Sequence, residues 1–238
     1  MPLMRYRDAE GGVSFARRDG SGRWERLSGD PLGPGGTQWE PSGEEARVER
    51  ILAPVQPAAI FCIGLNYRRH AAETGAPLPQ WPVLFMKSPG AVQDPDAPIA
   101  LPRALASGQV DYEGELAVVI GRRCRNVGRD EALGAVLGFT CGNDVSARDW
   151  QKQWGGGQWC RGKTFDTFAP MGPVLVPLSE LEDPLHLPLR TTLNGEVVQE
   201  GETGDMIFDV PSLIAFLSGS TTLLPGTVIF TGTPEGVG

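Results

Sequence analysis

The chain has 238 residues, of which 40% are hydrophobic and 21% are charged, enough apolar material for one catalytic domain and a small appendage. Its formal net charge of −8 disfavours nucleic acid and anionic membrane surfaces as partners. No charge-free apolar stretch reaches the ~18 residues of a membrane-spanning helix, and residues 1–7 lack the apolar core of a secretory signal. We therefore expect a cytoplasmic protein that binds a small molecule.

The first fifty-odd residues predict short strands separated by glycine-rich turns. A Gly/Pro-rich stretch at residues 31–36 and a charged segment at residues 44–50 follow them. After Pro54 and Pro57 the composition becomes more apolar, which indicates a boundary near residue 55. We expect a small N-terminal domain at residues 1–55 and a catalytic domain at residues 56–238.

The catalytic domain is predicted to consist mainly of short strands joined by turns. The expected strands lie at residues 58–63, 116–120, 136–140 and 227–230. A helical turn is expected after Asn66 and a short helix over residues 130–135, whereas the region after Asp144 reads as turn-rich loops. The 32 glycines and 21 prolines fit this β-rich α+β architecture.

Two later elements have stronger local signals. Asn194-Gly195, flanked by residues 187–193 and 196–199, predicts a tight hairpin, because both turn residues tolerate positive φ. Asp209 is a predicted helix N-cap with Pro211 in the first turn. The apolar face of that helix is expected to consist of Leu213, Ile214, Phe216 and Leu217, ahead of Gly219.

Three carboxylates form the candidate metal site. Glu113 and Glu115 stand two residues apart at the start of an apolar strand, so the strand's period of two places them on one face. Asp144 ends a later apolar run and is the candidate third ligand. A hard cation such as Mg²⁺ or Mn²⁺ would offset the repulsion between these groups. The alternative, more common for an isolated E-x-E pattern, is two solvated strand residues and a turn aspartate.

His70 and Glu73 form the candidate proton-transfer pair. Their spacing of three on a helical turn places the imidazole beside the carboxylate. The carboxylate fixes the imidazole tautomer, which suits a general base that activates water. An unrelated pair of surface residues is equally consistent with this spacing. His186 is interpreted as structural.

Residues 157–164 match the phosphate-binding pattern GxxxxGK[ST], but their context does not. A phosphate loop follows a buried strand and opens a helix, whereas here prolines and glycines follow the pattern. We therefore expect no nucleotide at this segment. Lys163 is instead expected to bind an anion, such as a substrate carboxylate or a developing enolate.

Five motifs in order resemble the fumarylacetoacetate hydrolase family. They are Gly64-Leu65-Asn66-Tyr67 with His70 and Glu73, Asp111-Tyr112-Glu113-Gly114-Glu115-Leu116, Asn143-Asp144-Val145-Ser146-Ala147-Arg148-Asp149, Gly162-Lys163-Thr164-Phe165-Asp166, and Thr231-Gly232-Thr233-Pro234-Glu235-Gly236-Val237-Gly238. The resemblance runs from about residue 58 to the end of the chain. Within this family, Gln158-Trp159 and the residues after them most resemble the branch that contains fumarylacetoacetate hydrolase domain-containing protein 2 and its bacterial relatives.

The resemblance implies a fold and a set of residue roles. The fold would be a mixed β-sandwich roll, barrel-like, in a homodimer. Mg²⁺ or Mn²⁺ would be held by Glu113, Glu115 and Asp144, with His70 and Glu73 as a catalytic dyad on a lid. Lys163 would act on the enolate side, and the substrate would be bound by Tyr67, Arg148, Gln151 and Thr233. Family members usually continue through further strands after the last of these motifs. The resemblance therefore implies either that the C-terminal strands of the domain are missing from this sequence or that the barrel closes differently here.

The implied reaction is metal-dependent hydrolysis of a C–C bond in a small β-diketo acid, such as an acylpyruvate, a fumarylacetoacetate-like acid or a 2,4-diketo-3-deoxy sugar acid. A metal chelated by the keto acid would stabilise the enolate formed by cleavage. Oxaloacetate decarboxylation and isomerisation or decarboxylation of hydroxymuconate-type diacids are the alternatives. A non-catalytic binding protein on the same scaffold is a further alternative.

Overall fold

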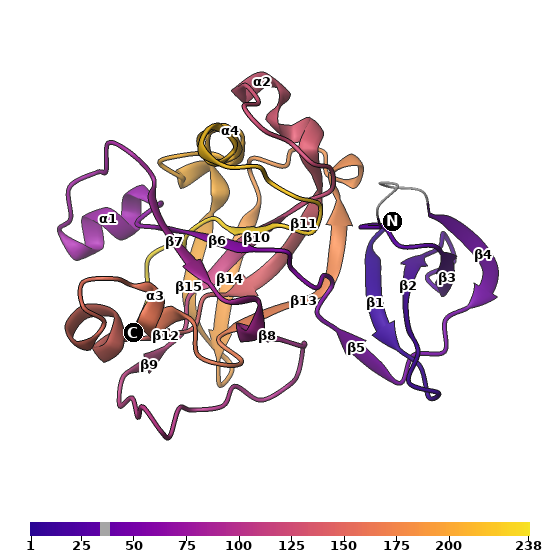
Figure 1. The fold of residues 1–238 in the computed structure, drawn as a ribbon, viewed down its shortest axis with the longest axis horizontal. Coiled ribbons are helices and arrows are strands. Elements are labelled where there is room, and N and C mark those ends of the chain that lie inside the picture. Colours follow the sequence, from indigo (N-terminus) through magenta and orange to yellow (C-terminus); the bar gives the residue numbers. More distant parts are fainter. Residues whose placement is uncertain (34–38) are drawn as a thin grey trace.

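The computed structural model describes residues 1–33 and 39–238. The Gly/Pro-rich stretch predicted at residues 31–36 falls partly outside these residues. An N-terminal group of strands lies beside a larger body in which helices and loops surround a sheet (Figure 1).

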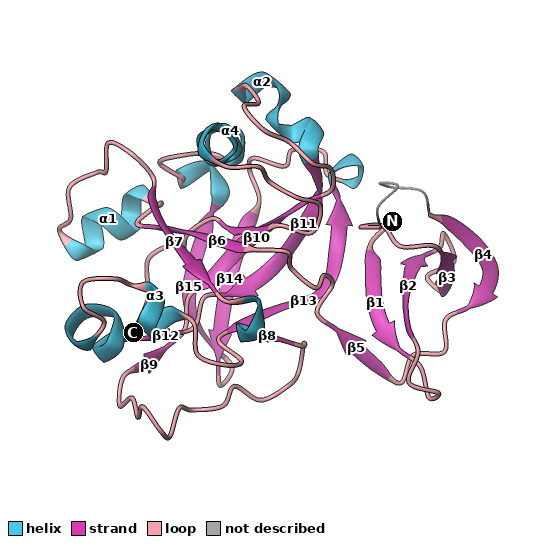
Figure 2. Ribbon diagram, in the orientation of Figure 1, coloured by secondary structure: helices cyan, strands magenta, loops and turns pink. Residues whose placement is uncertain are grey.

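The N-terminal strands form an antiparallel meander, coloured magenta with the other strands in Figure 2. They are β1 (Leu3–Arg7), β2 (Val13–Arg18), β3 (Trp24–Ser28), β4 (Glu40–Glu45) and β5 (Arg50–Leu52). Strand β1 pairs with both β2 and β5 and also meets β13 at Leu3↔Leu175. The N-terminal strands are therefore continuous with the main sheet, and the domain boundary near residue 55 stays a prediction.

The main sheet has the strand order β4-β3-β2-β1-β13-β11-β10-β16-β6-β7. Beyond the N-terminal strands this order contains β6 (Ile60–Gly64), β7 (Val83–Lys87), β10 (Gly114–Ile120), β11 (Val136–Asn143), β13 (Ala169–Pro177) and β16 (Val228–Phe230). Strand β16 runs parallel to β6 and antiparallel to β10. The mixed sheet confirms the predicted fold class, but among the described strands β4 and β7 remain at opposite ends of the order, so the sheet does not close into a barrel.

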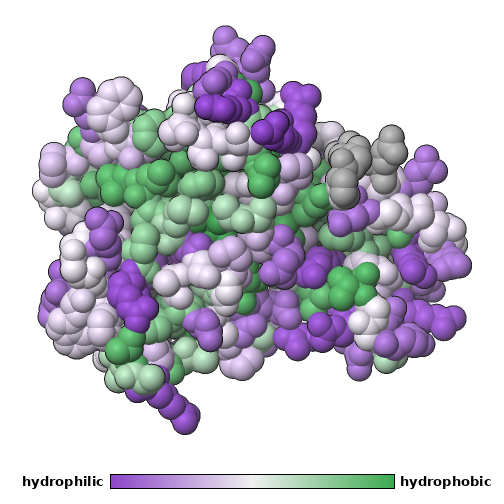
Figure 3. Space-filling view, viewed as in Figure 1, coloured by the Kyte–Doolittle hydropathy of each residue, from purple (hydrophilic) through white to green (hydrophobic). Residues whose placement is uncertain are grey.

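Short strands and helices complete the fold. The further strands are β8 (Val92–Gln93), β9 (Val110–Asp111), β12 (Ser146–Ala147), β14 (Pro188–Leu193) and β15 (Glu196–Glu202). The helices are α1 (Arg68–Thr74), α2 (Arg129–Ala132), α3 (Cys160–Lys163) and α4 (Val210–Ser220), with 3₁₀ turns at η1 (Pro89–Ala91), η2 (Leu133–Ala135), η4 (Leu178–Glu180) and η5 (Thr203–Asp205) and a π-helical turn at η3 (Trp150–Trp154). Apolar side chains gather in the left half of the face shown in Figure 3, where Figure 1 places α1, β6 and β7.

The two strongest local predictions are confirmed with one correction. Asn194 and Gly195 have φ values of 52° and 88°, as a tight hairpin between β14 and β15 requires. The Asp209 side chain accepts a hydrogen bond from Ser212 N at 3.0 Å and caps α4. Phe216 was predicted to face the core but is 37% exposed, because the buried stripe of this helix is narrower than its apolar sequence suggests.

Strand β13 was missed, because its segment reads as a turn-rich loop. Residues 169–177 contain three prolines, and proline lacks the N–H that a ladder needs. The strand nevertheless pairs with β11 across a register irregularity and with β1 near its far end. The irregularity accommodates the prolines, since a bulge leaves backbone groups unpaired.

Candidate active site

The structure brings the three predicted carboxylates together. The pairing of β10 with β11 places Glu115 opposite Gly142, and Asp144 N donates to Glu113 O at 2.8 Å. Ligand oxygens of Glu113, Glu115 and Asp144 all lie within 4.8 Å of one another. The three side chains are buried, with residue exposures of 8%, 3% and 0%. They are therefore not the solvated strand residues of the alternative interpretation.

Lys163 lies between two of these carboxylates. Its Nζ donates to Glu113 Oε2 and to Asp144 Oδ2, both at 2.8 Å. Burial alone would lower the pKa of Lys163, but Asp144 and Glu113 outweigh it and raise that pKa. Lys163 is therefore a fixed cation within the carboxylate cluster.

Arg148 contacts two acidic residues of the cluster, Asp111 and Glu113. Its guanidinium pairs with Asp111, with Nε donating to Oδ2 at 2.8 Å, and also with Glu113 Oε1. It donates to Gln151 Oε1 at 3.1 Å. Asp111 begins the motif that contains Glu113 and Glu115, but no role was predicted for it. The period of two that places Glu113 and Glu115 on one face also includes Asp111, and this was the available signal.

Two glutamates of the cluster have opposite pKa shifts. Burial alone would raise the pKa of Glu113, but Lys163 and Arg148 lower it to about 2. The pKa of Glu115 is raised well above its ordinary value by burial and by the charges of Asp144 and Glu113. Glu115 accepts a hydrogen bond from Gly232 N at 2.8 Å. Glu115 is therefore the carboxyl of the cluster that takes up a proton most readily when no cation is bound.

A divalent cation fits these residues. Four carboxylates (Asp111, Glu113, Glu115 and Asp144) face three basic side chains (Lys87, Lys163 and Arg148), so the cluster has one uncompensated negative charge when all four carboxylates are ionised. Asp144 Oδ1 is buried and, within the described part of the chain, forms an ion pair with Lys87 at 2.6 Å but accepts no hydrogen bond. Clustered carboxylate oxygens are the ligands that Mg²⁺ and Mn²⁺ prefer.

The raised pKa of Glu115 predicts how the metal-free protein responds to pH. Its carboxyl contributes stability that is complete below the ordinary pKa of 4.5 and is lost as pH rises through the raised pKa. Glu113 has the opposite shift, so its contribution is already complete above pH 4.5. In EDTA, the melting temperature should fall as pH rises from about 5 through the raised pKa of Glu115, and Glu115→Gln should flatten this dependence. Parallel melting profiles for the two proteins would contradict the prediction.

The predicted dyad is also formed. His70 Nδ1 lies 3.2 Å from Glu73 Oε2 on α1, and the His70 side chain is 15% exposed. Glu73 Oε1 accepts from Gly236 N at 3.1 Å. The loop that contains Gly236 also contains Gly232, which donates to Glu115. This loop therefore connects the dyad with the carboxylate cluster.

Two further predicted substrate-binding residues, Tyr67 and Thr233, lie in buried positions. Tyr67 is fully buried, and among the described residues its hydroxyl has no hydrogen-bond partner. Burial and the charge of Glu115 raise its pKa. Thr233 Oγ1 donates to Gly114 O at 2.9 Å and accepts from Gln199 Nε2 at 2.7 Å. The substrate contacts expected of Tyr67 and Thr233 stay predictions.

The phosphate-loop pattern lacks the required surroundings. The segment before it is the π-helical turn η3 rather than a strand, and α3 is a single helical turn inside the pattern. Lys163 points into the carboxylate cluster, where a phosphate would meet like charge.

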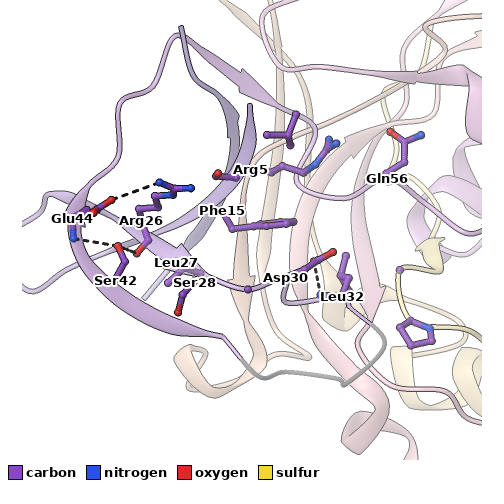
Figure 4. A pocket seen from close by; sticks show the side chains of 15 residues that line it. Arg5, Phe15, Arg26, Leu27, Ser28, Asp30, Leu32, Ser42, Glu44 and Gln56 are labelled. Atoms are coloured by element: carbon purple, nitrogen blue, oxygen red, sulfur yellow. Dashed lines mark hydrogen bonds and ion pairs between the residues drawn. The ribbon is translucent and has the colours of Figure 1, made fainter. Parts of the chain in front are cut away.

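A separate cavity lies on the N-terminal sheet. Figure 4 shows its side chains, including Arg26 and Glu44, whose charged groups approach to 3.6 Å. Its volume is about 620 Å³, and none of the candidate active-site residues lines it. The candidate active site is therefore separate from this cavity.

Comparisons to known proteins identify the family of the chain. Residues 59–238 match the family description "Fumarylacetoacetate (FAA) hydrolase C-terminal", and the chain belongs to the fumarylacetoacetate hydrolase family. A fumarylacetoacetate hydrolase domain-containing protein 2 homolog from Dictyostelium discoideum is 47% identical over 197 residues, covering 79% of this chain and 64% of the relative. The Homo sapiens mitochondrial oxaloacetate tautomerase FAHD2A is 46% identical over 189 residues, which cover 79% of this chain and 60% of that relative.

Solved structures show the same family relationship. The 2-hydroxyhepta-2,4-diene-1,7-dioate isomerase from Mycobacterium marinum has a TM-score of 0.84 at 39% identity and covers 100% of this chain and 89% of that one. Fumarylpyruvate hydrolase from Pseudomonas aeruginosa, in complex with Mn²⁺ and pyruvate, has a TM-score of 0.69 at 33% identity. The match covers 80% of this chain and 82% of that one. This chain spans about three fifths of the length of the two curated relatives above. Among the described residues, no helix is long and apolar enough to cross a membrane.

Proposed function

We propose that this protein catalyses enolisation of a small 2-keto diacid, as a keto–enol tautomerase of oxaloacetate or a similar acid. The observation that carries this proposal is the buried carboxylate triad, whose charge is not fully compensated by its basic neighbours. With a bound dication the cluster changes from one excess negative charge to one excess positive charge, which attracts an anionic substrate. Relatives named oxaloacetate tautomerases, at 45–46% identity, support this choice of substrate.

The triad residues Glu113, Glu115 and Asp144 would hold Mg²⁺ or Mn²⁺. The metal would supply Lewis-acid stabilisation of the negative charge that develops on the keto oxygen. Lys163 is fixed beside the same carboxylates and adds a second positive charge on that side of the site. Arg148 and Gln151 would bind the acid group next to the keto carbon.

Proton transfer is assigned to the dyad. His70 would take the proton from the carbon next to the keto group and deliver it to the enolate oxygen, and it would move the proton in the opposite direction during ketonisation. Glu73 accepts from Gly236 N and contacts His70 Nδ1, so it holds the imidazole against the loop that reaches Glu115. Tyr67 and Thr233 would complete the substrate-binding wall on the same loop and helix.

Hydrolysis of a C–C bond in an acylpyruvate is the second candidate. Its support is the similarity to fumarylpyruvate hydrolase, at 33% identity. The same enolate would leave after His70 had activated a water molecule for attack on the distal carbonyl. Isomerisation of a hydroxymuconate-type diacid needs only the enolisation half of this chemistry and is supported by the isomerase from Mycobacterium marinum.

The experiment that tests the proposal compares enol ketonisation with C–C cleavage. Purified protein with Mn²⁺ is mixed with the enol form of oxaloacetate, and the loss of enol absorbance is followed; parallel reactions contain an acylpyruvate, with pyruvate release as the readout. We expect acceleration of enol loss without pyruvate formation from oxaloacetate. Acceleration of acylpyruvate cleavage alone would favour the hydrolase, and no acceleration of either would contradict both enzyme proposals.

The assembly and location are also proposals. Leu84 and Met86 are exposed at 41% and 42% on β7, which lies at the end of the sheet order. An apolar edge strand is suited to pairing with a second copy, which supports the homodimer. A cytoplasmic location is proposed from the composition.

A further inference from the structure

Lys87 is a buried lysine that neither the sequence motifs nor the proposed mechanism uses. It ends strand β7, and its side chain has no solvent exposure. Its Nζ donates to Val145 O at 2.9 Å, to Phe168 O at 2.8 Å and to Lys163 O. A lysine amino group has three N–H donors, so these three backbone carbonyls use all of them.

Lys87 Nζ also lies 2.6 Å from Asp144 Oδ1. This contact is an ion pair whose geometry differs from that of a hydrogen bond, because the donors of Lys87 are directed at the three carbonyls. Asp144 Oδ1 is therefore held by the charge of Lys87. The other oxygen, Oδ2, accepts from Lys163.

The three carbonyls belong to segments that are distant in sequence from Lys87, by 58, 76 and 81 residues. Val145 follows the metal-ligand candidate Asp144, and Lys163 carries the amino group that bridges Glu113 and Asp144. Phe168 leads directly into β13. One side chain thus fastens the two segments that place Asp144 and Lys163 to the strand β7.

We propose that Lys87 is a positioning residue of the metal site, which sets Asp144 and Lys163 in the arrangement that binds the cation. This inference rests on the proposed function, because it assumes that the triad binds a divalent metal. Lys87 would touch neither metal nor substrate and would act through the backbone of the residues that do. Such outer partners of metal ligands typically change metal affinity by about 10–100-fold when they are removed.

The direction in which metal affinity changes when Lys87 is removed distinguishes a positioning role from simple charge repulsion. If Lys87 acted only as a positive charge near Asp144, its removal would tighten binding of a dication. If it positions the ligand segments, its removal leaves three buried carbonyls without donors, and the ligands lose their arrangement. Lys87→Met removes both the charge and the donors while keeping a side chain of similar length.

The test measures the dissociation constant of Mn²⁺ alone by titration calorimetry, together with the electron paramagnetic resonance spectrum of the bound ion. We expect Lys87→Met to weaken Mn²⁺ binding by about 10–100-fold and to alter the spectrum. Lys152→Met, on the exposed face of η3, is the charge-matched control. Leu217→Ala, in the buried face of α4, is a destabilised control that should keep the wild-type affinity.

The outcomes distinguish this inference from the proposed function. Wild-type protein that fails to bind Mn²⁺ would contradict the proposed metal site itself. Wild-type binding with equal or tighter binding by Lys87→Met, or an equal loss in Leu217→Ala, would overturn only the role of Lys87. If Lys87→Met does not fold, Lys87→Gln replaces it, because an amide keeps two N–H donors without the charge; it should also bind more weakly than wild type, and unchanged affinity would overturn the proposal.

Discussion

Saturating Mn²⁺ or Mg²⁺ should raise the melting temperature of this protein by roughly 5–10 °C, and Glu113→Ala combined with Glu115→Ala should abolish the rise. A ligand at about one hundred times its dissociation constant stabilises the folded state by about 2.7 kcal/mol. For a chain of this length, 1 kcal/mol corresponds to about 2–4 °C. The double variant removes two of the three carboxylates that lie within 4.8 Å of one another. Differential scanning fluorimetry with and without EDTA measures the shift.

A matched control is available outside the cluster. Glu200 is exposed and pairs with Arg190 at 2.6 Å on the hairpin of β14 and β15. Glu200→Ala should keep the full metal-induced shift, since this pair lies outside the carboxylate triad. A shift of wild-type size in the double variant would show that the metal binds elsewhere and would remove the triad as the metal site.

His70→Ala should lower turnover by about 10²–10⁴-fold, the range for loss of a general base, while the Mn²⁺-induced melting shift remains. The reason is that His70 belongs to α1 and contacts Glu73, whereas the cation would be held by carboxylates of other segments. Initial rates of enol loss and of acylpyruvate cleavage measure the effect. Glu73→Gln should reduce turnover less, because an amide oxygen can still accept from Gly236 N.

The second histidine provides the control for this experiment. His186 also pairs with a carboxylate three residues away, since its Nδ1 lies 2.8 Å from Asp183 Oδ2. Both members of that pair are more than half exposed, so His186→Ala should leave turnover unchanged. Full activity of His70→Ala in both assays would assign proton transfer to another group.

The sequence predicted those parts of the site that depend on local periodicity. A period of two placed Glu113 and Glu115 together, and a spacing of three placed His70 beside Glu73, as the structure shows. The hairpin at Asn194 followed from the same kind of local rule. In each case the partners are separated by three residues or fewer, so backbone geometry alone determines their contact.

Contacts between distant segments could not be predicted in this way. Lys87 ends a short strand that periodicity did not reveal, and its partners lie 58 or more residues away. Arg148 and Lys163 were predicted to contact the substrate, which stays a prediction, but their hydrogen bonds to carboxylates of the cluster were not predicted. Which acceptor a long basic side chain reaches depends on the tertiary arrangement, and one sequence does not contain that information in its spacing.

The position of β16 has a consequence for synthesis of the chain. This strand consists of residues 228–230 and lies between β10 and β6, parallel to β6. Strands β6 and β10 are both synthesised before β16, so each keeps an unpaired ladder of N–H and C=O groups until residues 228–230 can pair with it. Such edges can recruit strands from other molecules, and the pairing of β16 with both strands is a late, long-range step that removes them.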